Sequence, residues 1–92
     1  MTDDELRRKS VIKDVITIFI DVINFLTADE KKMVNRNTHI IKDFNVGGGD
    51  AAEFGVALEK YFLVKISTKG WGQAVLIHEI ADVIIKHLDK KP

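Results

Sequence analysis

The sequence predicts an all-α protein: a small four-helix bundle with three long helices and one short helix. Three stretches of the 92-residue chain repeat apolar residues at three- and four-residue steps, the spacing that places them on one face of a helix. Thr or Asp stands three residues before Glu near three expected helix starts, a capping pattern. No segment shows the sustained alternation of a strand. A small helical bundle is therefore the expected architecture.

The first helix is predicted to begin at Thr2 and Glu5 and to continue to about Leu26. Apolar residues outside its main stripe give it more apolar surface than one buried face needs. We therefore expect it either to lie between several neighbours or to expose a patch for a partner. The main stripe is Leu6, Ile12, Val15, Ile16, Phe19, Val22, Ile23 and Leu26, and the additional residues are Ile18, Ile20 and Phe25.

Residues 27–46 are predicted to form a long connection, because their apolar residues are isolated among charged and polar ones. Thr27 and Glu30 repeat the capping pattern, so a helical turn is expected inside this connection. The three glycines that follow, residues 47–49, are expected to end any regular structure.

The second long helix is predicted from Asp50 to about Phe62, with Asp50 and Glu53 as its start signal. Gly55 inside this helix costs about 1 kcal/mol relative to Ala. The apolar positions are Phe54, Leu58, Tyr61 and Phe62, with Val56 and Ala57 between them.

The remaining segments are an extended connection, a short helix and a last long helix. Residues 63–66 alternate weakly, but a lone short strand has nothing to pair with. Residues 67–72 contain cap residues and glycines around Trp71, with room for one helical turn. The last helix is predicted from the apolar spacing of Leu76, Ile77, Ile80, Ile84 and Leu88.

Size and charge exclude several functional classes. We expect residues 1–92 to form one domain, because the chain is too short for a second core. Fourteen Lys and Arg balance fourteen Asp and Glu, so the protein has no long-range field to attract nucleic acid, anionic lipid or an acidic substrate. Nucleic acid and membranes are therefore not expected as partners.

The absence of cysteine excludes a disulfide framework, a thiolate zinc site and a cysteine nucleophile. The most apolar run, residues 15–26, is too short to span a bilayer and contains Asp21 and Asn24. The N-terminal residues are acidic, where a secretory leader would be basic. We expect a cytoplasmic protein.

The segment from Asp43 to Ser67 resembles the central block of acyl carrier proteins. That family reads Asp-Leu-Gly-x-Asp-Ser-Leu, then an acidic helix containing Ala-Leu-Glu, then Phe-Gly-Ile-x-Ile. The corresponding residues here are Asp43-Phe44-Asn45-Val46-Gly47-Gly48-Gly49, Ala57-Leu58-Glu59 and Phe62-Leu63-Val64-Lys65-Ile66.

The likeness extends over about residues 37–88. Asn37-Thr38-His39-Ile40 is similar to the family's Asn-Thr-x-Phe step, and residues 76–84 are similar to its last helix. Residues 47–54 also resemble a bacterial group of carrier-like proteins of unassigned function. The resemblance implies an acyl carrier protein-like four-helix bundle, with a long loop between the first two long helices and Trp71 in a short third helix.

Gly48 stands at the position of the family's Ser, which carries 4'-phosphopantetheine. Gly has no hydroxyl to modify, and shifting the register would put Ala51 there instead. Ser10 and Ser67 lie elsewhere in the predicted fold. The resemblance therefore implies a divergent member that carries no covalent cofactor.

In acyl carrier proteins the second long helix binds partner enzymes through its acidic residues. The resemblance implies a recognition face here of Asp50, Glu53, Phe54 and Glu59. Lys60 and Tyr61 stand where further acids are expected, so electrostatic attraction to such partners is expected to be weaker.

The expected function is that of a non-enzymatic, monomeric module that binds proteins, with acyl-transfer or synthase enzymes of fatty acid or polyketide synthesis as the implied partners. One alternative is a degenerate carrier that holds a fatty acyl or other apolar ligand non-covalently in its core. A second alternative is a structural or oligomerising bundle that uses the additional apolar surface of the first helix. Ligand-dependent stability and light scattering, respectively, distinguish these alternatives.

Other candidate sites are weaker. Glycines before a helix can present backbone amides to phosphate, but no Lys or Ser/Thr follows at nucleotide-loop spacing, so a flexible linker is preferred. His78 and Asp82 have a metal-ligand spacing on one helix face beside Glu79, but no further ligand is evident, with His87 on nearly the opposite face and His39 in the loop. Trp71 is expected to close the bundle rather than to bind a partner.

Overall fold

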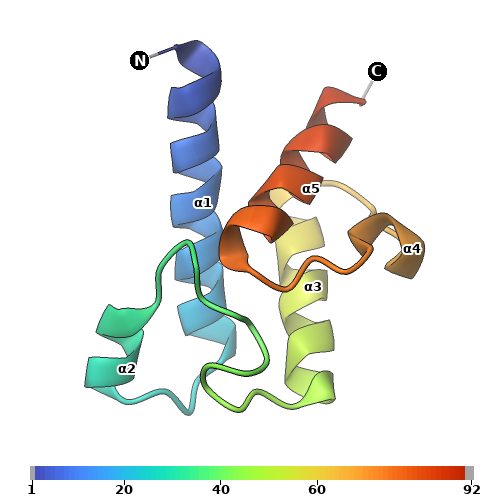
Figure 1. Cartoon of the computed structure of the whole chain (residues 1–92). Coiled ribbons are helices and arrows are strands. Elements are labelled where there is room, and N and C mark those ends of the chain that lie inside the picture. The colour runs from blue at the N-terminus through green and yellow to red at the C-terminus, as the bar shows by residue number, and fades with distance from the viewer. Residues whose placement is uncertain (1, 91–92) are drawn as a thin grey trace.

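Five helices account for most of the described chain, residues 2–90 of the computed structural model. They are α1 (Asp3–Val22), α2 (Ala28–Met33), α3 (Gly48–Phe62), α4 (Thr68–Trp71) and α5 (Ile77–Asp89) (Figure 1). These residues contain no strand; one isolated antiparallel bridge joins His39 to Leu76. The predicted all-α class is confirmed, with three long helices and two short ones.

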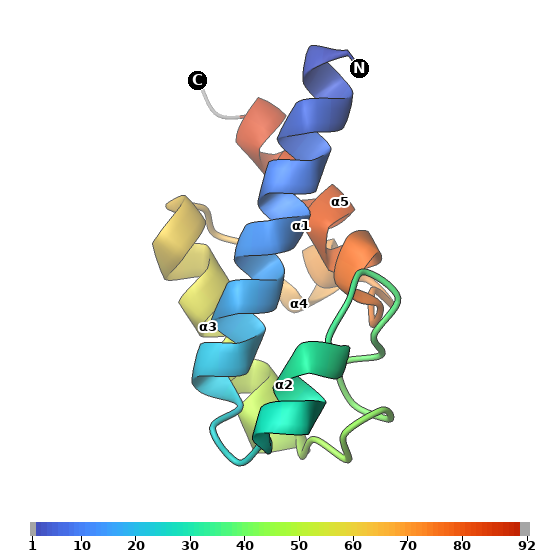
Figure 2. The same ribbon diagram turned by 90° about the vertical axis from the view of Figure 1, so that its left-hand side faces the viewer.

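The longest helix, α1, packs against both α5 and α3. Figure 2 shows α1 in front, with α3 on one side of it and α5 on the other. The start of α1 and the end of α5 lie at the same end of the molecule, where Arg7 Nη1 donates to Asp89 Oδ1 over 2.6 Å.

The core is formed by the facing sides of the three long helices and closed by apolar residues of the loops. Its centre is an aromatic pair, Phe19 of α1 and Phe54 of α3, whose rings meet edge to face with centroids 5.2 Å apart. Phe44 in the loop before α3 packs against Phe19 on its other side. The other fully buried large side chains are Ile23, Leu58, Ile77, Ile84 and Val15.

The predicted helix starts at Thr2 and Thr27 are confirmed. Thr2 Oγ1 accepts a hydrogen bond from the Glu5 amide. Thr27 and Glu30 form a reciprocal capping box that starts α2, with bonds of 3.1 and 3.0 Å. Both threonines therefore satisfy amides that have no partner inside their helix.

The first helix ends earlier than predicted. Ile23 leaves the helical conformation and caps α1, although its side chain and that of Leu26 are buried. Burial at helical spacing does not require the helix to continue, and here the chain turns after Ile23 to reach Thr27.

The start of α3 also differs from the prediction. Gly48 and Gly49 are its first two residues, and Gly47 is the N-cap without a side-chain bond. Asp50 is therefore a residue of the first turn rather than the cap, where its negative charge still suits the helix dipole. The expected linker of three glycines is thus largely helical.

The connection after α3 follows the prediction. Leu63 ends α3 in the left-handed conformation, residues 64–67 belong to neither a helix nor a strand, and Ser67 is extended. Ser67 Oγ accepts a hydrogen bond from the Gly70 amide over 2.9 Å and starts α4, a single turn that ends at Trp71. Gly72 follows with a positive φ of 62°.

The loop before α3 is joined to the start of α5 by backbone hydrogen bonds. The amides of Ile77 and His78 donate to the carbonyls of Thr38 and Arg36, and the Ile40 amide donates to Val75, over 2.8 to 3.0 Å. Loop carbonyls therefore satisfy amides at the N-terminus of α5.

Candidate functional site

The residue in place of the carrier-protein Ser, Gly48, is exposed in the first turn of α3. Nothing lies within 4 Å of the position that a Cβ would occupy there. Ser10 lies inside α1 and Ser67 caps α4, as expected from their places in the sequence. The start of α3 therefore offers no hydroxyl for a covalent group.

The four residues of the expected recognition face do not form one surface. Phe54 is 2% exposed and packs in the core against Phe19, so it is removed from the exposed face. Asp50 and Glu59 are nine residues apart, which at about 100° per residue places them on opposite sides of α3. Of the four, only Glu53 is exposed on the outer face, while Asp50 and Glu59 are half-buried on its flanks.

A different set of residues forms the outer face of α3. Ala52, Glu53, Val56, Ala57 and Lys60 line a shallow, mainly apolar depression. Val56 lies at its centre with half of its surface exposed, and Glu53 and Lys60 place opposite charges before and after it. We call these five residues the outer face.

Leu63, the C-cap of α3, is a further exposed apolar residue. Its side chain is 74% exposed, the most of any large apolar residue described. It also adopts the left-handed conformation, with φ 55° and ψ 47°, which costs about 1 kcal/mol for a residue other than glycine. Leucine at this position is therefore favoured neither by burial of its side chain nor by the conformation of its backbone.

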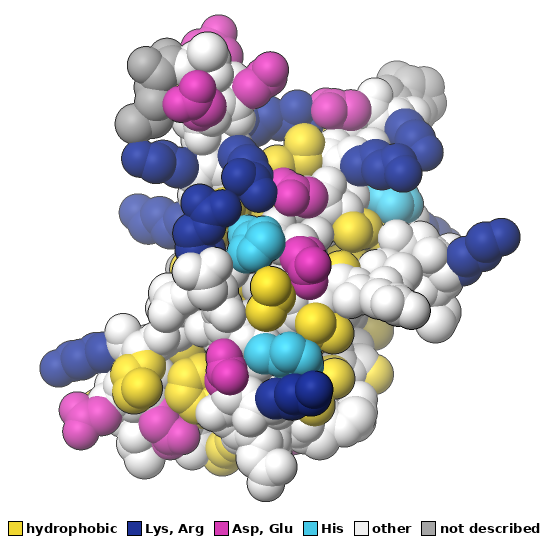
Figure 3. Space-filling model, in the orientation of Figure 1, with side chains coloured by type: hydrophobic (Ala, Val, Ile, Leu, Met, Phe, Trp, Pro, Cys, Tyr) yellow, Lys and Arg dark blue, Asp and Glu magenta, His cyan; other side chains and the backbone are white. Residues whose placement is uncertain are grey.

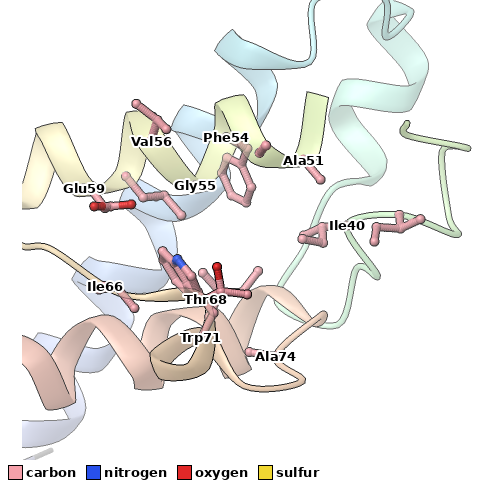
Figure 4. A pocket seen from close by; sticks show the side chains of 14 residues that line it. Ile40, Ala51, Phe54, Gly55, Val56, Glu59, Ile66, Thr68, Trp71 and Ala74 are labelled. Atoms are coloured by element: carbon pink, nitrogen blue, oxygen red, sulfur yellow. The ribbon is translucent and has the colours of Figure 1, made fainter. Parts of the chain in front are cut away.

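A cavity of about 490 Å³ lies between α3, α4 and the loop before α3, and it shares Ala52 and Val56 with the outer face. Its wall is mainly apolar. Figure 4 shows that Glu59 and Ile66 lie at one end, Ile40 and Ala51 at the other, and Phe54 and Trp71 face each other between them. Ligand pockets of this kind usually measure about 300 to 1,000 Å³.

Trp71 forms part of the cavity wall. Its half-buried ring packs against the core, as predicted, and its Nε1 lies 3.9 Å from the position of a Cβ at Gly55. A Cβ at Gly55 would therefore make only ordinary van der Waals contact with the indole. Trp71 is both a core residue and a wall of the cavity, a combination that the sequence analysis missed.

Three polar groups belong to residues that line the cavity: the Glu59 carboxylate toward one end, and the Thr68 hydroxyl and Trp71 indole N–H side by side between the two ends. The hydrogen bonds and ion pairs found among residues 2–90 include none made by these side chains. Among residues 2–90, Glu59 is also the only charged residue that lines the cavity.

Two histidines, His39 and His87, have local structural roles. His39 Nδ1 accepts hydrogen bonds from the amides of Ile41 and Lys42, and His87 Nδ1 bonds to the Val83 carbonyl over 2.9 Å. Asp82, the residue considered with His78 for a metal, is held by Arg8. Across residues 2–90, no three His, Asp or Glu side chains gather as a metal ion would require.

The Glu79 carboxylate, considered above as a neighbour of the metal-ligand pair, also bonds to the backbone. Its Oε1 accepts hydrogen bonds from the amides of Leu76 and Val75, which lowers the pKa of this carboxyl below its ordinary value. Glu79 therefore caps the start of α5.

Charges of both signs are mixed on one face of the molecule. On the face shown in Figure 3, acidic and basic side chains lie among one another, with apolar side chains between them. None of the helices within residues 2–90 combines the length and the apolar character needed to cross a membrane.

Most of the additional apolar surface of α1 is covered. Ile18 and Ile20 pack against the core cluster as partly buried residues. Phe25, beyond the end of α1, stays 51% exposed. Of the additional apolar residues considered for oligomerisation, only Phe25 therefore remains largely exposed.

Comparison of the chain with protein-family models, curated proteins and solved structures finds no match. The two candidate sites, the outer face of α3 and the cavity between α3 and α4, are therefore defined by the structure alone.

Proposed function

We propose that the protein is a non-enzymatic, acyl carrier protein-like module that binds a protein partner through the outer face of α3 and carries no covalent phosphopantetheine. The observation that carries this proposal is the exposed apolar surface of Val56, flanked by the charges of Glu53 and Lys60. Leu63, at the end of the same helix, is also exposed. Enzymes of the acyl-transfer or synthase type are the proposed partners.

The order of helices supports the carrier-like part of the proposal. A long loop containing only the short α2 separates α1 from α3, and the short α4 precedes α5. Four of these helices, α1, α3, α4 and α5, correspond in order and relative length to those of the carrier bundle, and Gly48 falls at the start of α3 where the modified Ser is expected.

Intact-mass measurement tests the absence of the covalent arm. The protein is incubated with coenzyme A and a phosphopantetheinyl transferase, with a functional acyl carrier protein as a positive control. We expect no change in mass, because Gly48 has no hydroxyl. A gain of one phosphopantetheine group would refute this part of the proposal, and peptide mapping would locate it.

Site-specific photocrosslinking in cells of the source tests the docking face. A photoreactive residue replaces Val56 in one variant and the exposed Lys13 of α1 in the control. A discrete adduct at Val56 and none at Lys13 is expected. Equal adducts at both positions, or none at Val56, would contradict docking through the outer face.

Charge reversal then tests the geometry with the crosslinked partner, purified. Glu53→Lys is expected to weaken binding by about fivefold or more, because it removes the mixed charge beside Val56. Glu59→Lys on the flank is the matched control and is expected to have a smaller effect. If both weaken binding equally, the docking surface includes the flank as well, and the outer face as defined here is wrong.

A second candidate function is non-covalent binding of an apolar ligand, because the cavity of about 490 Å³ has a mainly apolar wall. A ligand that binds only the folded state raises the melting temperature. A thermal-shift series with single-chain amphiphiles tests this function, and no shift at saturating ligand would exclude it.

A further inference from the structure

We propose that the cavity between α3 and α4 selects single-chain amphiphiles by the charge of their head group: it accepts neutral or cationic heads that donate a hydrogen bond and discriminates against carboxylates. This inference rests on the second candidate function, binding of an apolar ligand. It adds the chemical class of the ligand and the residue that determines it, Glu59.

The cavity has one apolar end and one polar end. Ile40 and Ala51 lie at the apolar end, with no charged residue among the described residues that line it. Glu59 lies at the other end, and Thr68 lies next to the Trp71 indole between the two ends (Figure 4). An amphiphile therefore fits in one orientation, with its chain toward Ile40 and its head toward Glu59.

The three polar lining residues offer both acceptors and donors. The Glu59 carboxylate only accepts hydrogen bonds, the Trp71 Nε1 only donates, and the Thr68 hydroxyl does both. An alcohol or amide head matches this set, because it donates to Glu59 and accepts from Trp71 or Thr68. An ammonium head donates to Glu59 and is also attracted by the opposite charge of its carboxylate.

A carboxylate head is the poor match. It can accept from Trp71 and Thr68 but places a second negative charge beside Glu59, with no cation among the described lining residues to offset it. Glu59 is only half-buried, so solvent and salt reduce the repulsion. An affinity difference of about tenfold is expected between matched neutral and anionic ligands.

The experiment uses the full chain and the fluorescence of its one tryptophan, Trp71, which lies in the cavity wall. Decanol is titrated below its solubility limit, and decylamine and decanoate below their micelle concentrations, each separately at pH about 7.5, where the amine is protonated and the acid ionised. We expect decanol and decylamine to bind about tenfold or more tightly than decanoate.

Two charge-removing variants on the same helix locate the effect. Glu59→Gln is expected to tighten decanoate binding by about tenfold relative to the wild type, because the repelling charge is gone, and to change decanol binding by less than about threefold. Glu53→Gln makes the same chemical change on the outer face, away from the cavity, and is expected to keep the wild-type order. Amide shifts at Gly55, which lines the cavity, with none at Gly49, confirm where the ligands bind.

Two results would overturn the inference without affecting the apolar-ligand function: decanoate binding the wild type as tightly as decanol, or identical effects of the two glutamine variants. Saturable binding with shifts at Gly55 would remain in either case. If none of the three ligands binds the folded wild type, the apolar-ligand function fails and the charge selection with it.

Discussion

The guanidinium of Arg8 holds the carboxylate of Asp82 by two hydrogen bonds, from Nε to Oδ1 over 2.8 Å and from Nη2 to Oδ2 over 3.0 Å. The two residues are 74 positions apart and join the first half of α1 to α5. The bonds and the nearby negative charge raise the pKa of Arg8. This two-point contact therefore helps to fix the orientation of α1 relative to α5.

Asp82→Asn is expected to lower the free energy of unfolding by about 0.5–1 kcal/mol, because the pair is partly exposed to solvent. Urea unfolding at low salt and again in concentrated NaCl measures this difference, which salt should reduce. Asp21→Asn, at an exposed position near the end of α1, is the control and should be neutral or slightly stabilising. Equal losses for both variants would show that the Arg8 contact contributes nothing.

Phe54→Ala is expected to cost about 3–5 kcal/mol, because it empties the space beside Phe19 at the centre of the core. Val56→Ala, two residues further along α3 on the outer face, should change stability by less than about 0.5 kcal/mol. Urea unfolding compares the two, with Phe54→Leu as a milder variant if the alanine protein is unfolded. Similar costs at both positions would contradict the assignment of the buried and exposed sides of α3.

Gly49→Ala and Gly72→Ala are expected to have opposite effects. Gly49 is helical with open space where a Cβ would lie, so alanine should stabilise by about 0.5–1 kcal/mol. Gly72 has a φ of 62° and a ψ of −130°, which alanine adopts only with strain, so a loss of about 1–2 kcal/mol is expected. Thermal melting of both variants checks the prediction, which a stabilising Gly72→Ala would contradict.

Glu79→Gln is expected to lower the melting temperature near neutral pH and to have less effect in acid. The folded protein holds the pKa of Glu79 below its ordinary value of 4.5, so the ionised carboxylate stabilises the fold above that pH. This contribution is lost as the pH falls through the lowered pKa. Melting curves between neutral and acidic pH measure the difference between the two proteins.

Glu79→Asp serves as the control for that measurement. It keeps the charge but shortens the side chain that bonds the amides of Val75 and Leu76. A loss of stability in this variant too would assign the effect to the hydrogen bonds. A Glu79→Gln protein as stable as the wild type at every pH would exclude the role of Glu79 as a cap.

The helices were largely predictable because their signals are local. Apolar spacing identified the three long helices, and the caps at Thr2 and Thr27 act within one turn of their own helix. The glycines before Asp50 misled the prediction. Their low helix propensity is outweighed by the packing of Phe54 and the rest of α3 on α1, which depends on distant residues.

The candidate site was less predictable. The placement of Asp50 and Glu59 on opposite sides of α3 follows from their spacing alone. Phe54 shares the spacing of the core residues, so its burial was also predictable from the sequence. The cavity was not, because its wall combines the loop at Ile40, helix α3 and Trp71, which meet only in the folded chain. Leu63 gave no signal either, since its exposure and its backbone conformation depend on how α3 ends.

The bonds from Ile77 and His78 to the loop around Thr38 make the first turn of α5 depend on a segment about forty positions earlier in the chain. Those two amide hydrogens are shielded from solvent deuterium only while the loop stays in place. Their exchange rates therefore report the detachment of a surface loop from within a helix, and any event that loosens residues 36–40 also releases the start of α5.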